Sequence, residues 1–100
     1  MRTVNISKAR RFSLDSVQVG DLAGAGGMDA RLVCFEAGQS WEGGPEAVVY
    51  QVLEGEALLR AGAATERVGK GKLATLEAGE RHTVENAGGG LLVVLAVRQR

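Results

Sequence analysis

The chain has 100 residues, the length of one domain, and 45% of them are apolar, which is enough for a single core. Twelve basic and twelve acidic residues cancel, so nothing favours nucleic acid as a partner, which would call for a basic excess. One cysteine, Cys34, excludes a disulfide within the chain. The longest apolar run, Leu91–Val97, is far shorter than the roughly 20 residues that span a bilayer, and the first residues show no secretory signal. We therefore expect a soluble cytoplasmic protein with no membrane partner.

Glycine accounts for 15 of the residues and proline for one, while aromatic residues make up only 4%. This composition predicts many short strands joined by tight glycine turns, around a core of Val, Leu and Ala. Near the start, Val4 and Ile6 alternate with polar neighbours and are expected to form an edge strand. The stretch Asp21–Asp29 is rich in glycine and is expected to be a loop. Residues 1–29 are thus predicted to be the irregular part of the chain.

From residue 31 onward, apolar segments alternate with glycine turns at short spacing. The expected strands are Arg31–Ala37, Ala47–Leu53, Ala57–Ala61, Thr65–Val68, Leu73–Leu76, His82–Asn86 and Leu91–Arg98. Only a turn at Gly55 separates the second from the third, so these two are expected to form a hairpin. Short strands at this spacing predict an all-β sandwich or barrel in one domain, with its core over residues 31–98 and little or no helix.

Two stretches resemble the two sequence motifs of the cupin superfamily. The second motif has the form G-x5-P-x-G-x2-H-x3-N, and Gly71, Gly79, His82 and Asn86 reproduce its spacing, with glutamate where the family has proline. The end of the first motif, G-x5-HxH-x3-4-E-x6-G, resembles the strand, turn and strand VVYQVLEGEALL around Gly55. The resemblance implies a small single-domain cupin of the conserved-barrel type. Such a protein is an antiparallel jelly roll, or double-stranded β-helix, commonly a homodimer, with any site inside the barrel mouth.

In the metal-binding members of that family, two histidines and a glutamate of the first motif join the histidine of the second around a transition metal. Counted back from Gly55, the glutamate position of this chain is Val48, which cannot bind a metal. The two histidine positions fall on Glu42 and Gly44, or on Trp41 and Gly43. The segment Gln39–Glu46 is also shorter than the family formula and is expected to be a turn.

His82 is the only histidine in the chain, and a catalytic metal site usually has at least three protein ligands. We therefore expect no cofactor. If a divalent transition metal were bound, His82 would have to be joined by Glu42 or Glu46 in a rearranged site. Cys34 lies in an apolar strand with no sign of activation and is expected to be a buried hydrophobic residue.

Four residues are candidates for a binding site. His82 has an ordinary pKa near neutrality and could act as a general base or bind a ligand, or it could be an inert remnant. Tyr50 shares a strand face with Val48, and a buried tyrosine hydroxyl needs a partner, for which His82 is one candidate. Trp41 could stack on a ligand, anchor a dimer interface or plug the end of the barrel. The predicted ligand-binding residues are His82, Tyr50, Trp41 and Val48.

The sequence leaves three functional hypotheses. The favoured one is a metal-free barrel that binds a small molecule or acts as a dimeric binding or regulatory module. The second in rank is a metal-free enzyme that uses His82 as acid or base with Tyr50 as partner. The third is a metal-dependent dioxygenase or isomerase in which Glu42 or Glu46 joins His82. Because one fold hosts many reactions, the resemblance itself does not choose among them.

Overall fold

The computed structural model describes residues 1–100, and it is built almost entirely from antiparallel β-strands. Its one helical element is the four-residue 3-10 turn η1 (Ile6–Ala9), so no helix is long enough to cross a membrane. The strands are β1 (Gln18–Ala25), β2 (Met28–Phe35), β3 (Ser40–Glu42), β4 (Val48–Glu54), β5 (Glu56–Ala61), β6 (Ala64–Gly69), β7 (Leu73–Leu76), β8 (His82–Asn86) and β9 (Leu92–Gln99). The prediction of an all-β jelly roll is confirmed.

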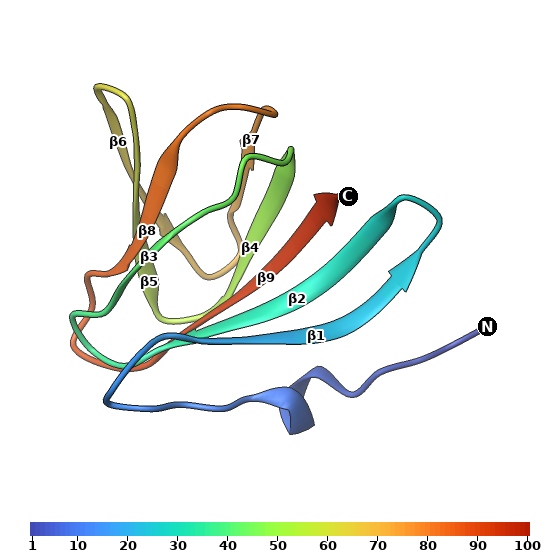
Figure 1. Ribbon diagram of the computed structural model, residues 1–100. Helices are drawn as coiled ribbons and strands as arrows, with labels where there is room; N and C mark the ends of the chain where they lie inside the picture. The colour runs from blue at the N-terminus through green and yellow to red at the C-terminus, as the bar shows by residue number, and fades with distance from the viewer.

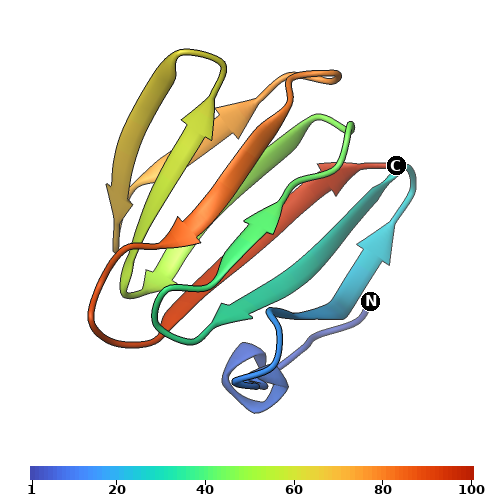
Figure 2. The ribbon, with the colours of Figure 1, turned by 60° about the vertical axis from the view of Figure 1, so that its left-hand side comes forward.

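Two sheets face each other (Figure 1). One has five strands in the order β1-β2-β9-β4-β7, and the other has four in the order β3-β8-β5-β6. In Figure 1 the sheets converge at the lower end and diverge at the upper end, where the loops 43–47 and 77–81 lie. We call this upper end the open end. Figure 2 shows β3 and β8 of the smaller sheet in front of the larger sheet.

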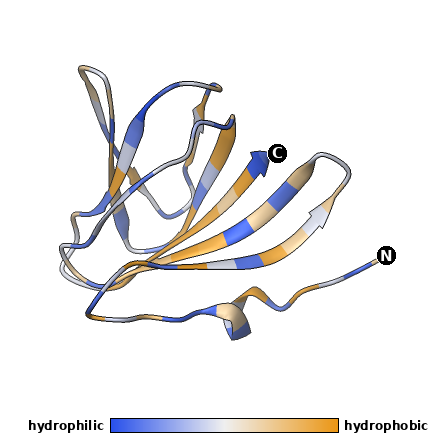
Figure 3. Cartoon of the chain, in the orientation of Figure 1, coloured by the Kyte–Doolittle hydropathy of each residue, from blue (hydrophilic) through white to orange (hydrophobic).

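Alternation along the strands places one set of side chains between the sheets. On β4, for example, Val48, Tyr50 and Val52 are buried while Val49 and Gln51 are exposed. β9 is hydrophobic over most of its length and hydrophilic at its C-terminal end (Figure 3). Thirteen buried residues form the core between the sheets: Val33, Phe35, Val48, Tyr50, Val52, Ala57, Leu59, Val68, Leu76, Val84, Leu92, Val94 and Ala96. The closed part of the barrel is therefore packed with side chains.

The hairpin expected at Gly55 does not form. β4 pairs with β7 and β9, whereas β5 pairs with β6 and β8, so the chain passes from one sheet to the other between them. An irregularity between Val52 and Glu54 bends the end of β4, and Gly55 follows with a φ of 84°. A side chain at Gly55 would overlap the carbonyl of Leu91, so the crossing requires glycine for both reasons.

The glycine-rich stretch Asp21–Asp29, expected to be a loop, is instead the hairpin of β1 and β2. Only Gly26 and Gly27 form the turn, with Gly26 at a φ of 61°, as tight hairpin turns require. Glycines within β1 are tolerated because β1 is an edge strand with one neighbour. The edge strand expected at Val4 and Ile6 is absent, and Ile6 begins η1 instead.

The segment Gln39–Glu46, expected to be a turn, contains the short strand β3, which pairs with β8 through Trp41 and Val84. On the outer face of the larger sheet, a second cluster consists of Leu22, Leu32, Cys34 and Val93. Ile6, Ala9 and Phe12 of the N-terminal segment pack against this cluster. Cys34 is thus buried, as expected, but it lies outside the barrel interior.

Candidate functional site

The two buried polar residues of the barrel lie at opposite ends of β8, with His82 at the open end and Asn86 at the other. His82 and Tyr50 face the interior from β8 and β4, on opposite sheets, and are 3% and 2% exposed. Trp41 of β3 is half-buried and packs against the core. Arg31 of β2 has the same strand parity as the buried residues Val33 and Phe35, so its side chain also starts on the inner face. These four side chains, from four strands, make up what we call the mouth cluster.

The hydroxyl of Tyr50 lies 2.7 Å from Nε2 of His82, so the structure brings together the two residues that the sequence singled out. Nδ1 of His82 lies 2.9 Å from the carbonyl oxygen of Glu80, and a carbonyl can only accept a hydrogen bond. In the neutral ring the proton is therefore on Nδ1, and Nε2 accepts from the Tyr50 hydroxyl. Both ring nitrogens are satisfied, and the orientation of the imidazole is fixed.

Burial raises the pKa of the Tyr50 hydroxyl to about 12, because the phenolate would have to exist in an apolar interior. Two nearby charges act in opposite directions on this pKa. Arg31 lowers it and Glu46 raises it. Tyr50 is accordingly neutral at physiological pH and acts as a hydrogen-bond donor.

The aromatic rings of the mouth cluster are in mutual contact. Trp41 and Tyr50 meet edge to face with their centroids 6.4 Å apart, and Tyr50 and His82 do so at 5.5 Å. The guanidinium carbon of Arg31 lies 5.7 Å from the centroid of Trp41, within the range of a cation–π interaction. Trp41 therefore covers the interior at the open end, and Arg31 lies against its ring.

The residues present do not fit the metal centre known from cupins. Val48 occupies the glutamate position, and its side chain belongs to the apolar core. A Cβ at Gly43 would overlap the His82 ring at Nε2, so position 43 faces the one histidine but carries no side chain. No group of three or more His, Cys, Asp or Glu side chains in the chain could hold a metal ion.

The two acidic residues considered as substitute ligands are engaged elsewhere. Glu42 lies 3.5 Å from Arg81 in an exposed ion pair, and Glu46 lies 3.1 Å from Arg98. Arg98 also holds Asp29 at 2.8 Å, and this hydrogen bond is the main reason that the pKa of Asp29 is lowered. Neither Glu42 nor Glu46 is brought into a shared ligand set with His82.

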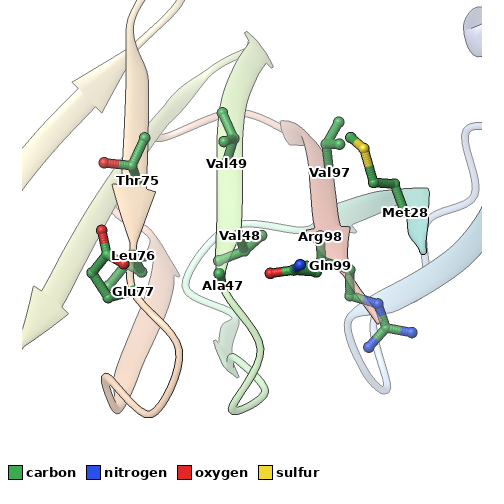
Figure 4. Close-up of a pocket in the computed structure, with 10 residues that line it drawn as sticks. All are labelled: Met28, Ala47, Val48, Val49, Thr75, Leu76, Glu77, Val97, Arg98 and Gln99. Carbon is green, nitrogen blue, oxygen red and sulfur yellow. The ribbon is translucent and has the colours of Figure 1, made fainter. Parts of the chain in front are cut away.

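Two hollows of the surface lie near the open end, and neither is lined by Tyr50 or His82. One of about 180 Å³ at the open end is lined by the loops over His82: Glu42, Gly43, Gly44, Pro45, Gly79, Glu80 and Arg81. Another of about 450 Å³ lies beside the ends of β4, β7 and β9 (Figure 4). Val48 is the only predicted site residue that lines the second hollow, and it also belongs with Tyr50 to the core between the sheets.

Several solved structures are similar to the whole chain. A protein from Thermus thermophilus has a TM-score of 0.90 at 22% identity, over 99% of this chain and 97% of that one. A conserved protein with a double-stranded β-helix domain from Klebsiella pneumoniae has a TM-score of 0.88 at 16% identity, over 99% and 90%. A cupin superfamily protein from Desulfitobacterium hafniense has a TM-score of 0.81 at 19% identity, over 98% and 90%. No family model and no curated protein matches the sequence.

These likenesses define the class of protein: the chain has the cupin fold. The resemblance seen in the spacing of Gly71, Gly79, His82 and Asn86 is thereby confirmed at the level of the fold. Gly79 takes a φ of 82°, and the Asn86 amide donates to the carbonyl of Gly90 at 2.8 Å, so both hold the turns beside β8. At this degree of identity the likeness shows the fold and carries no activity to this chain.

Sequence reasoning missed Arg31 as a site residue. The alternation of side chains along β2 could have identified it. Arg31 lies two residues before Val33, so both side chains start on the same inner face of the strand. Its contact with Trp41 depends on how β2 and β3 are placed in different sheets, which the sequence does not reveal.

Proposed function

We propose that this barrel binds a small organic molecule at its open end without a metal, with the mouth cluster as the binding surface. One observation carries the proposal: the core between the sheets is apolar over most of its length, and towards the open end Arg31, Trp41, Tyr50 and His82 bring polar and aromatic groups together. Binding sites in proteins are typically apolar with a few convergent polar groups that fix orientation. The donor set around His82, in contrast, supplies a single metal ligand.

The chain carries two natural reporters for a direct test. Trp41 and His82 are the only residues of their types, so the indole and imidazole NMR signals report the mouth cluster without labelling of selected sites. Protein purified without added ligand should release an organic molecule on extraction, or a screen of small molecules should shift both signals together. The methyl signals of the exposed residue Leu73 should stay in place as an internal control.

Metal binding is the competing outcome and is measured separately. The protein is incubated with iron, manganese, nickel and zinc, then washed and analysed for its metal content. We expect no stoichiometric transition metal. One firmly held ion per chain, together with broadening or shift of the His82 signals, would overturn the proposal in favour of a metal site.

A second candidate function, acid–base catalysis without a metal, rests on the 2.7 Å contact between Tyr50 and His82. A histidine with a fixed tautomer and a tyrosine partner can pass a proton once a substrate reaches the pair. The test is deuterium uptake by the carbonyl compounds pyruvate and dihydroxyacetone in heavy water, compared with Tyr50→Phe. Equal exchange by both proteins at the uncatalysed rate would reject this candidate.

A further inference from the structure

Arg31 is an arginine on the inner wall of the barrel that forms no ion pair, although its charge adds to the larger effect of Arg98 in lowering the pKa of Asp29. None of the seven ion pairs within 4.0 Å in the protein includes it. Its Nε is buried and has no hydrogen-bond partner in the protein. A buried donor left without a partner is costly, and such groups in proteins usually have one. The guanidinium therefore has unused capacity to donate hydrogen bonds.

Arg98, the second arginine on the inner face of the open end, differs from Arg31 because carboxylates accept its hydrogen bonds. Arg98 continues the inward row of Val94 and Ala96 on β9. It donates to Asp29 at 2.8 and 3.1 Å and to Glu46 at 3.1 Å. These two carboxylates are thus hydrogen-bonded to Arg98, and neither has an oxygen within 4.0 Å of an Arg31 nitrogen.

The surroundings of Arg31 match a flat organic anion. The guanidinium carbon of Arg31 lies over the Trp41 ring, 5.7 Å from its centroid, so the charge and an aromatic surface are adjacent. The fork of an arginine pairs with the two oxygens of a carboxylate in one plane. The Tyr50–His82 pair lies beyond Trp41 and adds polar character, and the Tyr50 hydroxyl does so without a negative charge that would repel an anion.

We propose that Arg31 anchors the carboxylate of a small organic acid at the open end, with the apolar part of the acid against Trp41. This inference rests on the proposed function, since it names the class of molecule that the mouth cluster binds. Tyr50 and His82 are buried and hydrogen-bonded to each other, and Tyr50 packs edge to face against Trp41, so the pair senses the bound molecule through that ring.

The test uses benzoate as the probe and benzamide as its neutral counterpart of the same shape. Binding is followed by the fluorescence of Trp41, the only tryptophan, and by the NMR signals of His82. We expect saturable binding of benzoate, and binding at least tenfold weaker for benzamide and for the Arg31→Gln variant. Arg31→Lys, which keeps the charge but loses the fork, should be intermediate. Circular dichroism verifies that each variant folds.

Arg67→Gln is the matched control. Arg67 lies on β6 in an exposed ion pair with Glu56, so its loss changes the net charge of the protein equally without touching the mouth cluster. It should bind benzoate like the unmodified protein. Phenyl phosphate is the second anionic probe, and it should bind more weakly than benzoate.

The outcomes separate this inference from the proposed function. Equal binding of benzoate and benzamide, unaffected by Arg31→Gln, would reject the anion and keep the binding barrel. Tighter binding of phenyl phosphate would reject the carboxylate. If no anion saturates the Trp41 signal at millimolar concentration, the inference is wrong, whatever the extraction and metal experiments show about the barrel.

Discussion

Tyr50 is the only tyrosine of the chain, so the absorbance of ionised phenol reports this one hydroxyl. With its pKa raised to about 12 by burial, the folded protein should show little phenolate absorbance at pH 10 to 11. The unfolded chain in denaturant should titrate near 10, the ordinary value. A folded protein that titrates near 10 would show that the hydroxyl is open to solvent and not held by His82.

The same pKa shift links stability to pH. Below pH 10 the folded and the unfolded protein both carry the protonated phenol, so the contribution of Tyr50 to the free energy of unfolding is constant. Between pH 10 and 12 only the unfolded state loses the proton, so the free energy of unfolding falls by up to about 2–3 kcal/mol. Tyr50→Phe lacks this contribution, so the difference in stability between the two proteins should narrow across this interval, as measured by urea unfolding at each pH.

Gly43 lies over the imidazole of His82, and a Cβ there would overlap Nε2. Gly43→Ala should therefore displace the ring, break the Tyr50–His82 hydrogen bond and destabilise the fold by about 1–3 kcal/mol. Gly20→Ala is the control, because a Cβ at Gly20 meets nothing within 4 Å and its φ is not positive. Equal denaturation midpoints for the two variants would contradict the close approach of Gly43 to His82.

Single residues of the site were only partly predictable from sequence. Tyr50 and His82 could be identified because strand parity and motif spacing act locally along the chain. The partner of Tyr50 stayed open among His82, a ligand and water, since β4 and β8 lie in different sheets. Arg31 was not predicted because its lack of an ion pair depends on the tertiary structure, in which Asp29 and Glu46 accept hydrogen bonds from Arg98.

At the scale of elements, residues 6–12 cover the second cluster, on the outer face of the larger sheet, and we call this segment the strap. Phe12 packs against this cluster, and Arg10 forms an ion pair with Glu54 at the end of β4. Burial raises the pKa of the Cys34 thiol beneath the strap. The native thiol should therefore react slowly with a disulfide reagent such as DTNB, at a rate set by local opening.

Loosening the strap should expose that thiol. Phe12→Ala removes part of the cover and should destabilise the segment by about 1–3 kcal/mol, which corresponds to a several-fold to hundredfold faster reaction of Cys34. Leu14→Ala is the control, because Leu14 is 85% exposed and should leave the rate unchanged. A rate for Phe12→Ala equal to that of the unmodified protein would show that the strap does not protect Cys34.

The strands themselves were more predictable than their pairing. Seven expected strands from residue 31 onward match β2 and β4 to β9 to within a few residues, because alternation and glycine turns are local signals. The prediction of a hairpin at Gly55 was wrong because the sequence pattern is the same whether the chain crosses to the other sheet or turns back to pair with the preceding strand. The prediction of a loop over Asp21–Asp29 was wrong because glycines in an edge strand cannot be distinguished by sequence from glycines in a loop.

For the whole molecule, the spacing of the second motif and the end of the first predicted the cupin fold although no family model matches the sequence. The fold depends on the spacing of turns and on the alternation of apolar residues, and both survive when individual ligands are replaced. The metal site depends on a few particular side chains. Val48 and Gly43 occupy such positions here, and they belong to the core and to the loop over His82 while the architecture of the barrel is kept.

Association of two copies is the remaining prediction for the whole molecule. Met28, Val49 and Leu73 are exposed on the outer face of the larger sheet, at 55%, 39% and 65%. The net charge of the chain is zero, so long-range repulsion between copies is weak. We therefore expect a homodimer that buries this uncovered part of the face, since exposed apolar patches mark interaction surfaces.

Sedimentation equilibrium and light scattering measure the dimer directly. Val49 lies on β4 between Thr75 of β7 and Val97 of β9, so Val49→Glu places a charge in the middle of the patch and should shift the protein to monomer. Thr65→Glu, on the exposed strand β6 of the other sheet, should leave the dimer intact. Because the patch lies on the outer face and the mouth cluster inside the barrel, the monomeric variant should still bind benzoate. Loss of benzoate binding on dissociation would mean instead that the second copy completes the site.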